Sequence, residues 1–213
     1  MKKVFSFILV AIMSMSLIAC GSNSEGEAGQ SEEKTLYSNG GPVEFFETPW
    51  LNPGAYTSTK VLYDHLIEAD ANLQPSKGEL AEDYTLSEDG TELVFNLRDD
   101  IYWHDGEKIT PEDVKWSIEY SMNTAVINSV FLNTFKAISG SADYLAGTKN
   151  ELSGVVIDGN KITITFDQVA PDALLTFTQF APLPKKYFDG VDPLKFQQAE
   201  YFQSPVGSGP FMI

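Results

Sequence analysis

The stretch that decides the fold is residues 78–122, GELAEDYTLSEDGTELVFNLRDDIYWHDGEKITPEDVKWSIEYSM. Apolar and more polar residues alternate along residues 93–98, which is the period of a strand with one buried face. The apolar segment 101–104 follows after Asp99-Asp100, so we expect a hairpin here. Asp105-Gly106 is then a turn, because glycine reaches a positive φ at little cost.

A helix is predicted to begin directly after this turn. Thr110 can act as the N-cap by accepting a hydrogen bond from the amide of Asp113, and Pro111 suits the first helical position. Apolar residues recur at positions 114, 118 and 122, with Ser117 and Ser121 beside them. The pattern predicts one narrow apolar face that packs closely against the hairpin.

Five short blocks of this region also carry a family resemblance, through their order and spacing. They resemble the signature region of the large solute-binding proteins of peptide and nickel ABC importers. The blocks are Asp83 with Ser87-Glu88-Asp89-Gly90-Thr91, then Phe95-Asn96-Leu97-Arg98, Trp103-His104-Asp105-Gly106, Thr110-Pro111-Glu112-Asp113-Val114, and Ser117.

The resemblance implies an α/β fold like that of type II (cluster C) periplasmic binding proteins. Members of this family are usually more than twice as long, so the chain is expected to hold lobe one and the extra subdomain, and to stop before lobe two. The implied boundaries are a signal peptide at 1–19, an acidic tether at 20–34, the first segment of lobe one at 35–56, the extra subdomain at 57–176, and the return to lobe one at 177–213.

Composition restricts the partners. The formal charge is -16, and removal of a leader containing Lys2 and Lys3 makes it -18 by subtraction. Nucleic acid and anionic lipid headgroups are therefore not expected as partners, because binding to phosphates needs clustered cations. Cys20 is the only cysteine, which excludes an intrachain disulfide, and the two histidines are far apart. We expect no structural zinc and no cofactor.

The amino terminus has the order of a secretory signal. Lys2 and Lys3 precede an apolar run from 4 to 19. Leu17-Ile18-Ala19-Cys20 resembles the bacterial lipobox, which implies cleavage before Cys20 and lipidation of its thiol; a non-lipidated signal is the alternative. The segment that follows is rich in Ser, Glu and Gly, as is typical of a flexible tether. These features predict a lipoprotein on the outer face of the cell membrane.

Ligand-binding residues are expected after a first strand at 35–38. In the family, an aromatic loop at this position lines the cleft and ends in a run that Leu51-Asn52-Pro53 matches. Thr48, Trp50 and Asn52 are the candidates from this loop, although Trp50 could equally be a core residue. Phe131 is a further candidate, because a segment of the extra subdomain approaches the cleft in peptide-binding relatives.

The remaining elements follow from local patterns. Spacing predicts a helix over 57–68 and a polar loop over 70–77. Short helices are expected at 141–146 and 170–178, and a second hairpin is expected between 155–157 and 161–166. The glycine-proline run at 205–211 resembles the family's entry into a strand of lobe one. It lacks the lysine and the spacing of a phosphate-binding loop.

The leading functional hypothesis is a monomeric receptor that captures oligopeptides and delivers them to a membrane permease. A nickel chelate or another small solute is the alternative ligand. A surface hydrolase is the alternative class, but the chain has no Gly-x-Ser-x-Gly or His-Glu-x-x-His motif. A lipoprotein without a transport role is a third possibility. His104 beside Asp105 could suggest an acid–base pair, but the family resemblance implies a turn.

Overall fold

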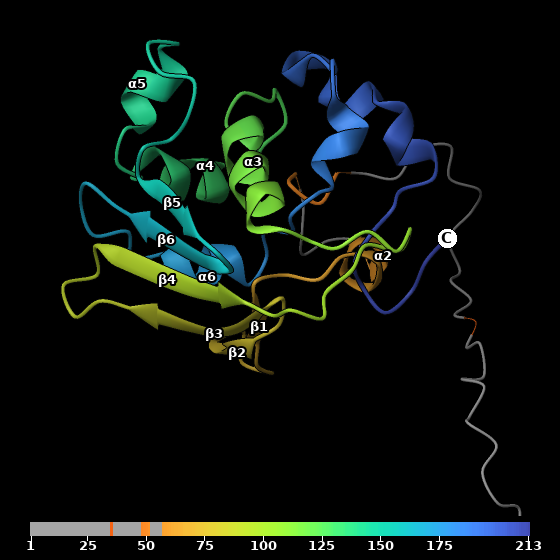
Figure 1. Cartoon of the computed structure of the whole chain (residues 1–213), viewed down its shortest axis with the longest axis horizontal. Coiled ribbons are helices and arrows are strands. Elements are labelled where there is room, and N and C mark those ends of the chain that lie inside the picture. Colours follow the sequence, from red (N-terminus) through yellow and green to blue (C-terminus); the bar gives the residue numbers. More distant parts are fainter. Residues whose placement is uncertain (1–34, 36–47, 52–56) are drawn as a thin grey trace, which may run out of the picture. The chain divides into compact units, whose positions relative to one another are not determined.

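The computed structural model describes Thr35, residues 48–51 and residues 57–213. Its folded part contains an antiparallel sheet of four strands, which lies below α3 (Pro111–Ser121), α4 (Ser129–Lys136) and α5 (Ser141–Leu145) in Figure 1. The order across the sheet is β3–β4–β6–β5, so two hairpins lie side by side. The strands are β3 (Ala81–Leu86), β4 (Glu92–Leu97), β5 (Val155–Asp158) and β6 (Lys161–Thr165).

The side chains on one face of this sheet are buried in the hydrophobic core. Leu93 and Phe95 of β4 pair with Ile164 and Ile162 of β6, and all four side chains are fully buried. The residues between them, such as Val94 and Thr163, lie on the opposite, more exposed face. The predicted alternation in both strands is confirmed, and so is the second hairpin.

The partner of β4 differs from the prediction. Residues 101–104 do not form the second arm of a hairpin; they contribute only an isolated bridge between Tyr102 and Lys108. The arm is β3, because the Ser87 hydroxyl accepts hydrogen bonds from the amides of Thr91 and Glu92 and closes the β3–β4 turn. The other edge of β4 pairs with β6, so no edge remains for residues 101–104.

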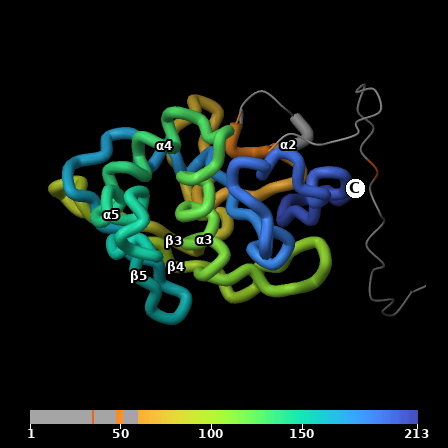
Figure 2. The backbone as a smooth tube through the Cα atoms, turned by 90° about the horizontal axis from the view of Figure 1, so that it is seen from above, coloured from red at the N-terminus to blue at the C-terminus, as the bar shows by residue number. Residues whose placement is uncertain are grey.

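Helix α3 (Pro111–Ser121) begins as predicted. The Thr110 hydroxyl accepts from the Asp113 amide and the Asp113 carboxylate accepts from the Thr110 amide, which completes a capping box. Val114 and Ile118 are fully buried, and so are Ser117 and Ser121. The helix contacts β5 and the later segment η1 (Lys185–Phe188), and it lies over the sheet in both views (Figures 1 and 2).

Three shorter helices complete the helical layer. Phe177 of α6 packs edge-on against Phe95 of the sheet, with ring centroids 5.1 Å apart. Phe135 of α4 is also fully buried. The helices are α4 (Ser129–Lys136), α5 (Ser141–Leu145) and α6 (Ala173–Phe177), so α5 and α6 confirm the predicted short helices.

The helix predicted over 57–68 is shorter in the structure. Helix α2 spans Thr57–Leu62 only, and β1 (Ile67–Ala69) pairs with β2 (Pro75–Gly78) where a polar loop was expected. The helix stops because other segments take its carbonyl groups. The amides of Ser208 and Gly209 both donate to the carbonyl of Leu62, at 2.9 and 2.8 Å.

The carboxyl-terminal part returns to α2. Segments η2 (Pro193–Gln198) and η3 (Glu200–Gln203) precede the glycine-proline run, which passes beside α2 in Figure 1. Phe211 donates to the carbonyl of Val61 at 3.1 Å, but residues 211–213 are not in a strand, contrary to the expectation. Residues 57–213 belong to one compact unit, and the boundaries at 56 and 176 stay a prediction.

Candidate ligand-binding site

The predicted ligand-binding loop is described only at residues 48–51, which form a tight turn. The Thr48 hydroxyl accepts from the amide of Trp50 at 3.3 Å, and the Thr48 carbonyl accepts from the amide of Leu51 at 3.3 Å. Thr48 is 2% exposed and Trp50 is fully buried. The loop is therefore attached to the body of the protein through this turn.

Two aromatic rings stack on the ring of Trp50. Its ring stacks on Phe196 with centroids 4.7 Å apart and on Phe180 at 5.5 Å. Its indole N–H donates a 2.8 Å hydrogen bond to the carbonyl of Ala181. A buried tryptophan with a satisfied N–H has one preferred orientation, so Trp50 fixes where the turn lies.

Asn128 makes a second attachment. The backbone N–H of Asn128 donates to the carbonyl of Trp50 at 2.8 Å, and its side-chain Nδ2 donates to the carbonyl of Leu51 at 3.3 Å. Its Oδ1 accepts from the amide of Val130 at 2.8 Å and thereby caps α4. One asparagine thus joins the start of α4 to the turn at 48–51.

Phe131 lies in the first turn of α4 and belongs to the same cluster. It is 2% exposed, and its ring meets Phe180 edge-on at 5.5 Å. Phe180 also stacks on Trp50. The structure therefore brings Trp50 and Phe131 together around the ring of Phe180, and Thr48 lies in the same turn as Trp50.

Three of the five predicted site residues lie in the described part of the chain, and two lie outside it. Thr48, Trp50 and Phe131 are buried side chains, so their observed contacts are with the protein core. Their contact with a ligand stays a prediction. Asn52 and the lipidation residue Cys20 lie outside the described residues.

Sequence reasoning missed the residues that hold the turn. Asn128 had a local signal, since an asparagine before the run Ser129-Val130-Phe131-Leu132 fits a helix N-cap. Phe180, Ala181 and Phe196 had none, because their contacts with Trp50 depend on the tertiary fold.

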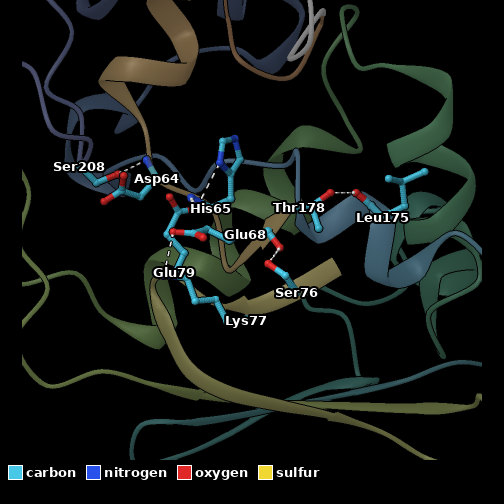
Figure 3. Close-up of polar contacts among 9 residues, drawn as sticks. All are labelled: Asp64, His65, Glu68, Ser76, Lys77, Glu79, Leu175, Thr178 and Ser208. Carbon is cyan, nitrogen blue, oxygen red and sulfur yellow. Dashed lines mark hydrogen bonds and ion pairs between the residues drawn. The ribbon is translucent and has the colours of Figure 1, made fainter. Parts of the chain in front are cut away.

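A separate hollow of about 510 Å³ lies beside β1. His65 donates its amide to Glu79 Oε2 at 2.8 Å, and its ring Nδ1 lies 3.4 Å from the same oxygen (Figure 3). Lys77 pairs with Glu68 at 3.3 Å. The two carboxylates at this hollow, Glu68 and Glu79, therefore each lie next to another side chain of the protein. It is lined by Lys60, His65, Ile67, Glu68, Ala69, Leu73, Glu79, Thr178 and Gln179.

Asp64 precedes His65 and has an altered acidity. Burial, together with the nearby negative charge of Glu79, raises the pKa of Asp64 to about 6. His65 and Arg98 act in the opposite direction. The Asp64 amide is held by the Ser208 hydroxyl at 2.9 Å, so this carboxyl lies where the carboxyl-terminal run meets the end of α2.

His104 and Asp105 do not form an acid–base pair. The His104 ring contacts Gly207 and Gly209. Asp105 instead accepts hydrogen bonds from the Tyr187 hydroxyl and from Lys186, both at 2.8 Å. The two neighbours serve different partners, as expected of a structural turn.

The described part of the chain offers neither a cluster of metal ligands nor a membrane-spanning helix. Within residues 48–51 and 57–213, no group of three or more His, Cys, Asp or Glu side chains could hold a metal ion. In the same part of the chain, no helix has the length and apolar character needed to cross a bilayer.

Comparison with known proteins identifies the family. Residues 76–213 match the model of the bacterial extracellular solute-binding proteins, family 5, middle region. The chain belongs to this family. The family consists of solute-binding proteins rather than enzymes, and the expected fold class is confirmed by the solved family 5 proteins described below.

Curated family 5 relatives include several peptide-binding proteins. A probable peptide-binding protein, YejA, of Agrobacterium fabrum is 31% identical over 162 residues, which cover 74% of this chain and 24% of the relative. The dipeptide-binding protein of Escherichia coli is 28% identical over 202 residues, covering 87% of this chain and 36% of the relative. The chain therefore spans about a quarter to a third of the length of these relatives.

Solved family 5 structures have the same fold over most of this chain. NikZ from Campylobacter jejuni, solved in complex with Ni(L-His), matches with a TM-score of 0.59 at 25% identity, covering 78% of this chain and 30% of NikZ. Lactococcal OppA, complexed with an endogenous peptide, also matches with a TM-score of 0.59 at 25% identity, covering 70% of this chain and 29% of OppA.

Proposed function

We propose that this chain is part of the solute-binding component of an ABC importer, that it captures peptides outside the cytoplasm and passes them to permease subunits, and that it is not an enzyme. The observation that carries the proposal is the family 5 match over residues 76–213. The names of the curated relatives favour peptides over other solutes.

The ligand contacts are proposed for the loop that contains residues 48–52, together with Phe131. The buried turn at Thr48 and Trp50 anchors the loop, so that neighbouring backbone groups can bond to an extended peptide. Main-chain hydrogen bonds give affinity with little dependence on ligand side chains. In this proposal Trp50 acts mainly by positioning the loop, and Asn52 is the more direct contact.

A nickel chelate is the second candidate ligand, because NikZ was solved with Ni(L-His) and matches this fold as well as OppA does. A cleft receptor buries most of its ligand between two walls. Since the chain spans only about a third of its relatives, we expect it to bind either ligand weakly by itself.

Photo-crosslinking detects such weak binding and locates it. A short peptide carrying a benzophenone group would be irradiated with the full chain, and the labelled residues identified by mass spectrometry. We expect labelling within residues 43–56 and near Phe131. Trp50→Ala should abolish it because the turn loses its anchor, whereas Trp116→Phe, a half-buried tryptophan on α3, should retain it.

The competing proposals give different outcomes in the same experiment. Competition by the nickel–histidine complex but not by unlabelled peptides would make the chelate the ligand. No specific labelling with either ligand would contradict the receptor proposal. Release of cleaved peptide or ester products would instead support the hydrolase.

We also propose that Cys20 is lipidated and holds a monomeric receptor on the outer face of the membrane. The lipobox-like Leu17-Ile18-Ala19-Cys20 supports this, and two or three acyl chains anchor a protein stably where one does not. Radiolabelled fatty acid should be incorporated into the wild-type protein and not into Cys20→Ser. Equal incorporation into both would contradict lipidation.

A further inference from the structure

Two fully buried serines lie one turn apart on helix α3 and bond to different partners. Ser121 donates its hydroxyl to the carbonyl of Ile118 in the same helix at 2.8 Å, a local bond that is common for serine in helices. The Ser117 hydroxyl instead bonds to a residue 66 positions away. It accepts from the backbone N–H of Leu183 at 2.9 Å and donates to the carbonyl of Leu183 at 3.3 Å. Ser117 therefore joins α3 to a distant segment.

The partner of Ser117 lies in a buried segment without regular secondary structure. Residues 180–184 are all buried, and none of them is in a helix or strand. Buried backbone groups need hydrogen-bond partners, and irregular backbone must find them on other segments. Leu183 finds them on Ser117, and the Ala181 carbonyl accepts from the indole N–H of Trp50 at 2.8 Å. The segment is thus bonded to α3 and, two positions earlier, to the turn at residues 48–51.

Two prolines make this segment stiff. Pro182 and Pro184 each fix their own φ at about −65°. Each proline also restricts the residue before it to extended conformations, which applies to Ala181 and Leu183. All four residues from 181 to 184 are therefore restricted. A shift of Leu183 is transmitted to the Ala181 carbonyl, because little rotation is available between them to absorb it.

Helix α3 holds the same segment at a second point. The Asp113 carboxylate accepts from the backbone N–H of Lys185 at 3.3 Å. Asp113 and Ser117 are four positions apart, so their side chains lie on the same face of the helix. The contact at Lys185 is exposed, whereas the contact at Leu183 is buried. Loss of the buried bond is the more costly, because water cannot take the place of the missing hydroxyl.

We propose that Ser117 is a positioning residue for the ligand-binding loop: through the stiff segment 181–184 it places the carbonyl that receives the indole N–H of Trp50. Trp50 in turn fixes the turn at residues 48–51, which belongs to that loop. The inference rests on the proposed function, in which the loop contacts a peptide. Ser117 is fully buried, so it acts on the loop through these residues and not by touching the ligand.

Hydrogen exchange of the Trp50 indole N–H tests this role in the full-length protein. The chain has three tryptophans, and single tryptophan-to-phenylalanine variants assign their indole signals. The exchange rate is divided by that of the Ile164 amide, which lies in the interior strand β6 and reports general unfolding. Ser117→Ala should raise this ratio about threefold to tenfold, as the loss of one net hydrogen bond implies. An unchanged ratio would overturn the proposal.

Ser121→Ala is the matched control. It also removes a buried hydroxyl from α3, but one whose bond stays within the helix. A general loss of stability would affect both variants, whereas loss of positioning is expected in Ser117→Ala alone. The ratio should therefore stay at the wild-type value in Ser121→Ala. An equal rise in the two variants would contradict a specific role of Ser117.

Wild-type exchange in low concentrations of urea decides the question if Ser117→Ala does not fold. The Leu183 amide and the Trp50 indole N–H should open together, with the same dependence of exchange on urea, because one movement of the segment exposes both. They should also open more readily than the Ile164 amide. Separate opening of the two groups, or opening only together with Ile164, would argue against positioning by this segment.

Photo-crosslinking with the benzophenone peptide separates this inference from the proposed function. Labelling of residues 43–56 should fall about threefold to tenfold in Ser117→Ala and stay unchanged in Ser121→Ala. If the wild-type protein is not labelled, the proposed function fails, while the exchange ratio still tests whether Ser117 positions Trp50. Full labelling of Ser117→Ala despite a raised exchange ratio would show that ligand binding does not depend on Ser117 and would overturn the proposal.

Discussion

The indole N–H of Trp50 donates to the carbonyl of Ala181, although 131 positions separate the two residues in the sequence. The bond joins the turn at residues 48–51 to the segment after α6. Stacking on Phe180 and Phe196 adds apolar contact to the same ring. A short turn is thus fixed by residues far along the chain.

Substitutions of Trp50 separate the contribution of the hydrogen bond to stability from that of the aromatic packing. Trp50→Phe keeps an aromatic ring but leaves the buried carbonyl of Ala181 unpaired, which should lower the free energy of unfolding by about 1–3 kcal/mol. Trp50→Ala also removes the packing and should cost about 3–5 kcal/mol. Urea unfolding measures both. Trp116→Phe is the matched control, and an equal loss in that variant would argue against the hydrogen bond as the cause.

Substitutions of Asn128 test its double role. Asn128→Ala removes both the cap of α4 and the bond to Leu51, and should cost about 1–2 kcal/mol. Asn128→Asp keeps the oxygen that accepts from Val130 but loses the donor to Leu51. Hydrogen exchange at the Val130 amide should therefore rise in the alanine variant and not in the aspartate variant. Equal exchange in the two would contradict the assigned cap.

Asp64 predicts a pH dependence of stability. Its folded pKa of about 6 lies above the ordinary value of 3.8, so burial of the charged form opposes folding. The stabilising contribution of the protonated form is complete below about pH 4 and is lost as pH rises through 6. After allowance for solvent screening of this partly exposed group, Asp64→Asn should stabilise the protein by about 1–2 kcal/mol at pH 7.

Unfolding by urea at two pH values checks this sign. The difference between Asp64→Asn and the wild-type protein should shrink towards zero near pH 4, which makes the acidic measurement an internal control. A variant that is less stable than the wild type at pH 7 would show that the carboxylate makes a favourable contact instead.

Alanine substitutions of Gly207 and Gly106 should lower the stability of the protein for different reasons. Gly207→Ala places a β-carbon against the Leu62 carbonyl, and overpacking of this kind costs about 1–3 kcal/mol or more. Gly106 has open space around it and a φ of +86°, so Gly106→Ala should cost only the roughly 1 kcal/mol of an unfavourable backbone conformation. Hydrogen exchange at Ser208 should rise in the first variant alone. Comparable exchange in both would contradict close packing.

Local sequence signals predicted the elements that depend on near neighbours. The cap at Thr110 and the alternation in β4 and β6 are confirmed because each follows from residues a few positions apart. The same five blocks gave the family, which the match over residues 76–213 bears out.

Signals of this kind fail where a distant segment decides the outcome. The apolar spacing over 57–68 is genuine, yet α2 ends at Leu62 because Ser208 and Gly209 occupy its carbonyl. Residues 101–104 have a strand composition, but both edges of β4 are taken by β3 and β6. For the candidate site, the sequence predicted that Trp50 and Phe131 both contact the ligand. Phe180, whose ring contacts both of them, had no local sequence signal.

The bonds from residues 208–211 to Val61 and Leu62 bring the entrance and the exit of the intervening polypeptide to one point. A region whose two ends touch can be inserted into a host protein or removed from it without spanning a gap. The sheet and its helices therefore have the geometry of an inserted domain, which recombination could exchange between receptors while the host backbone stays continuous.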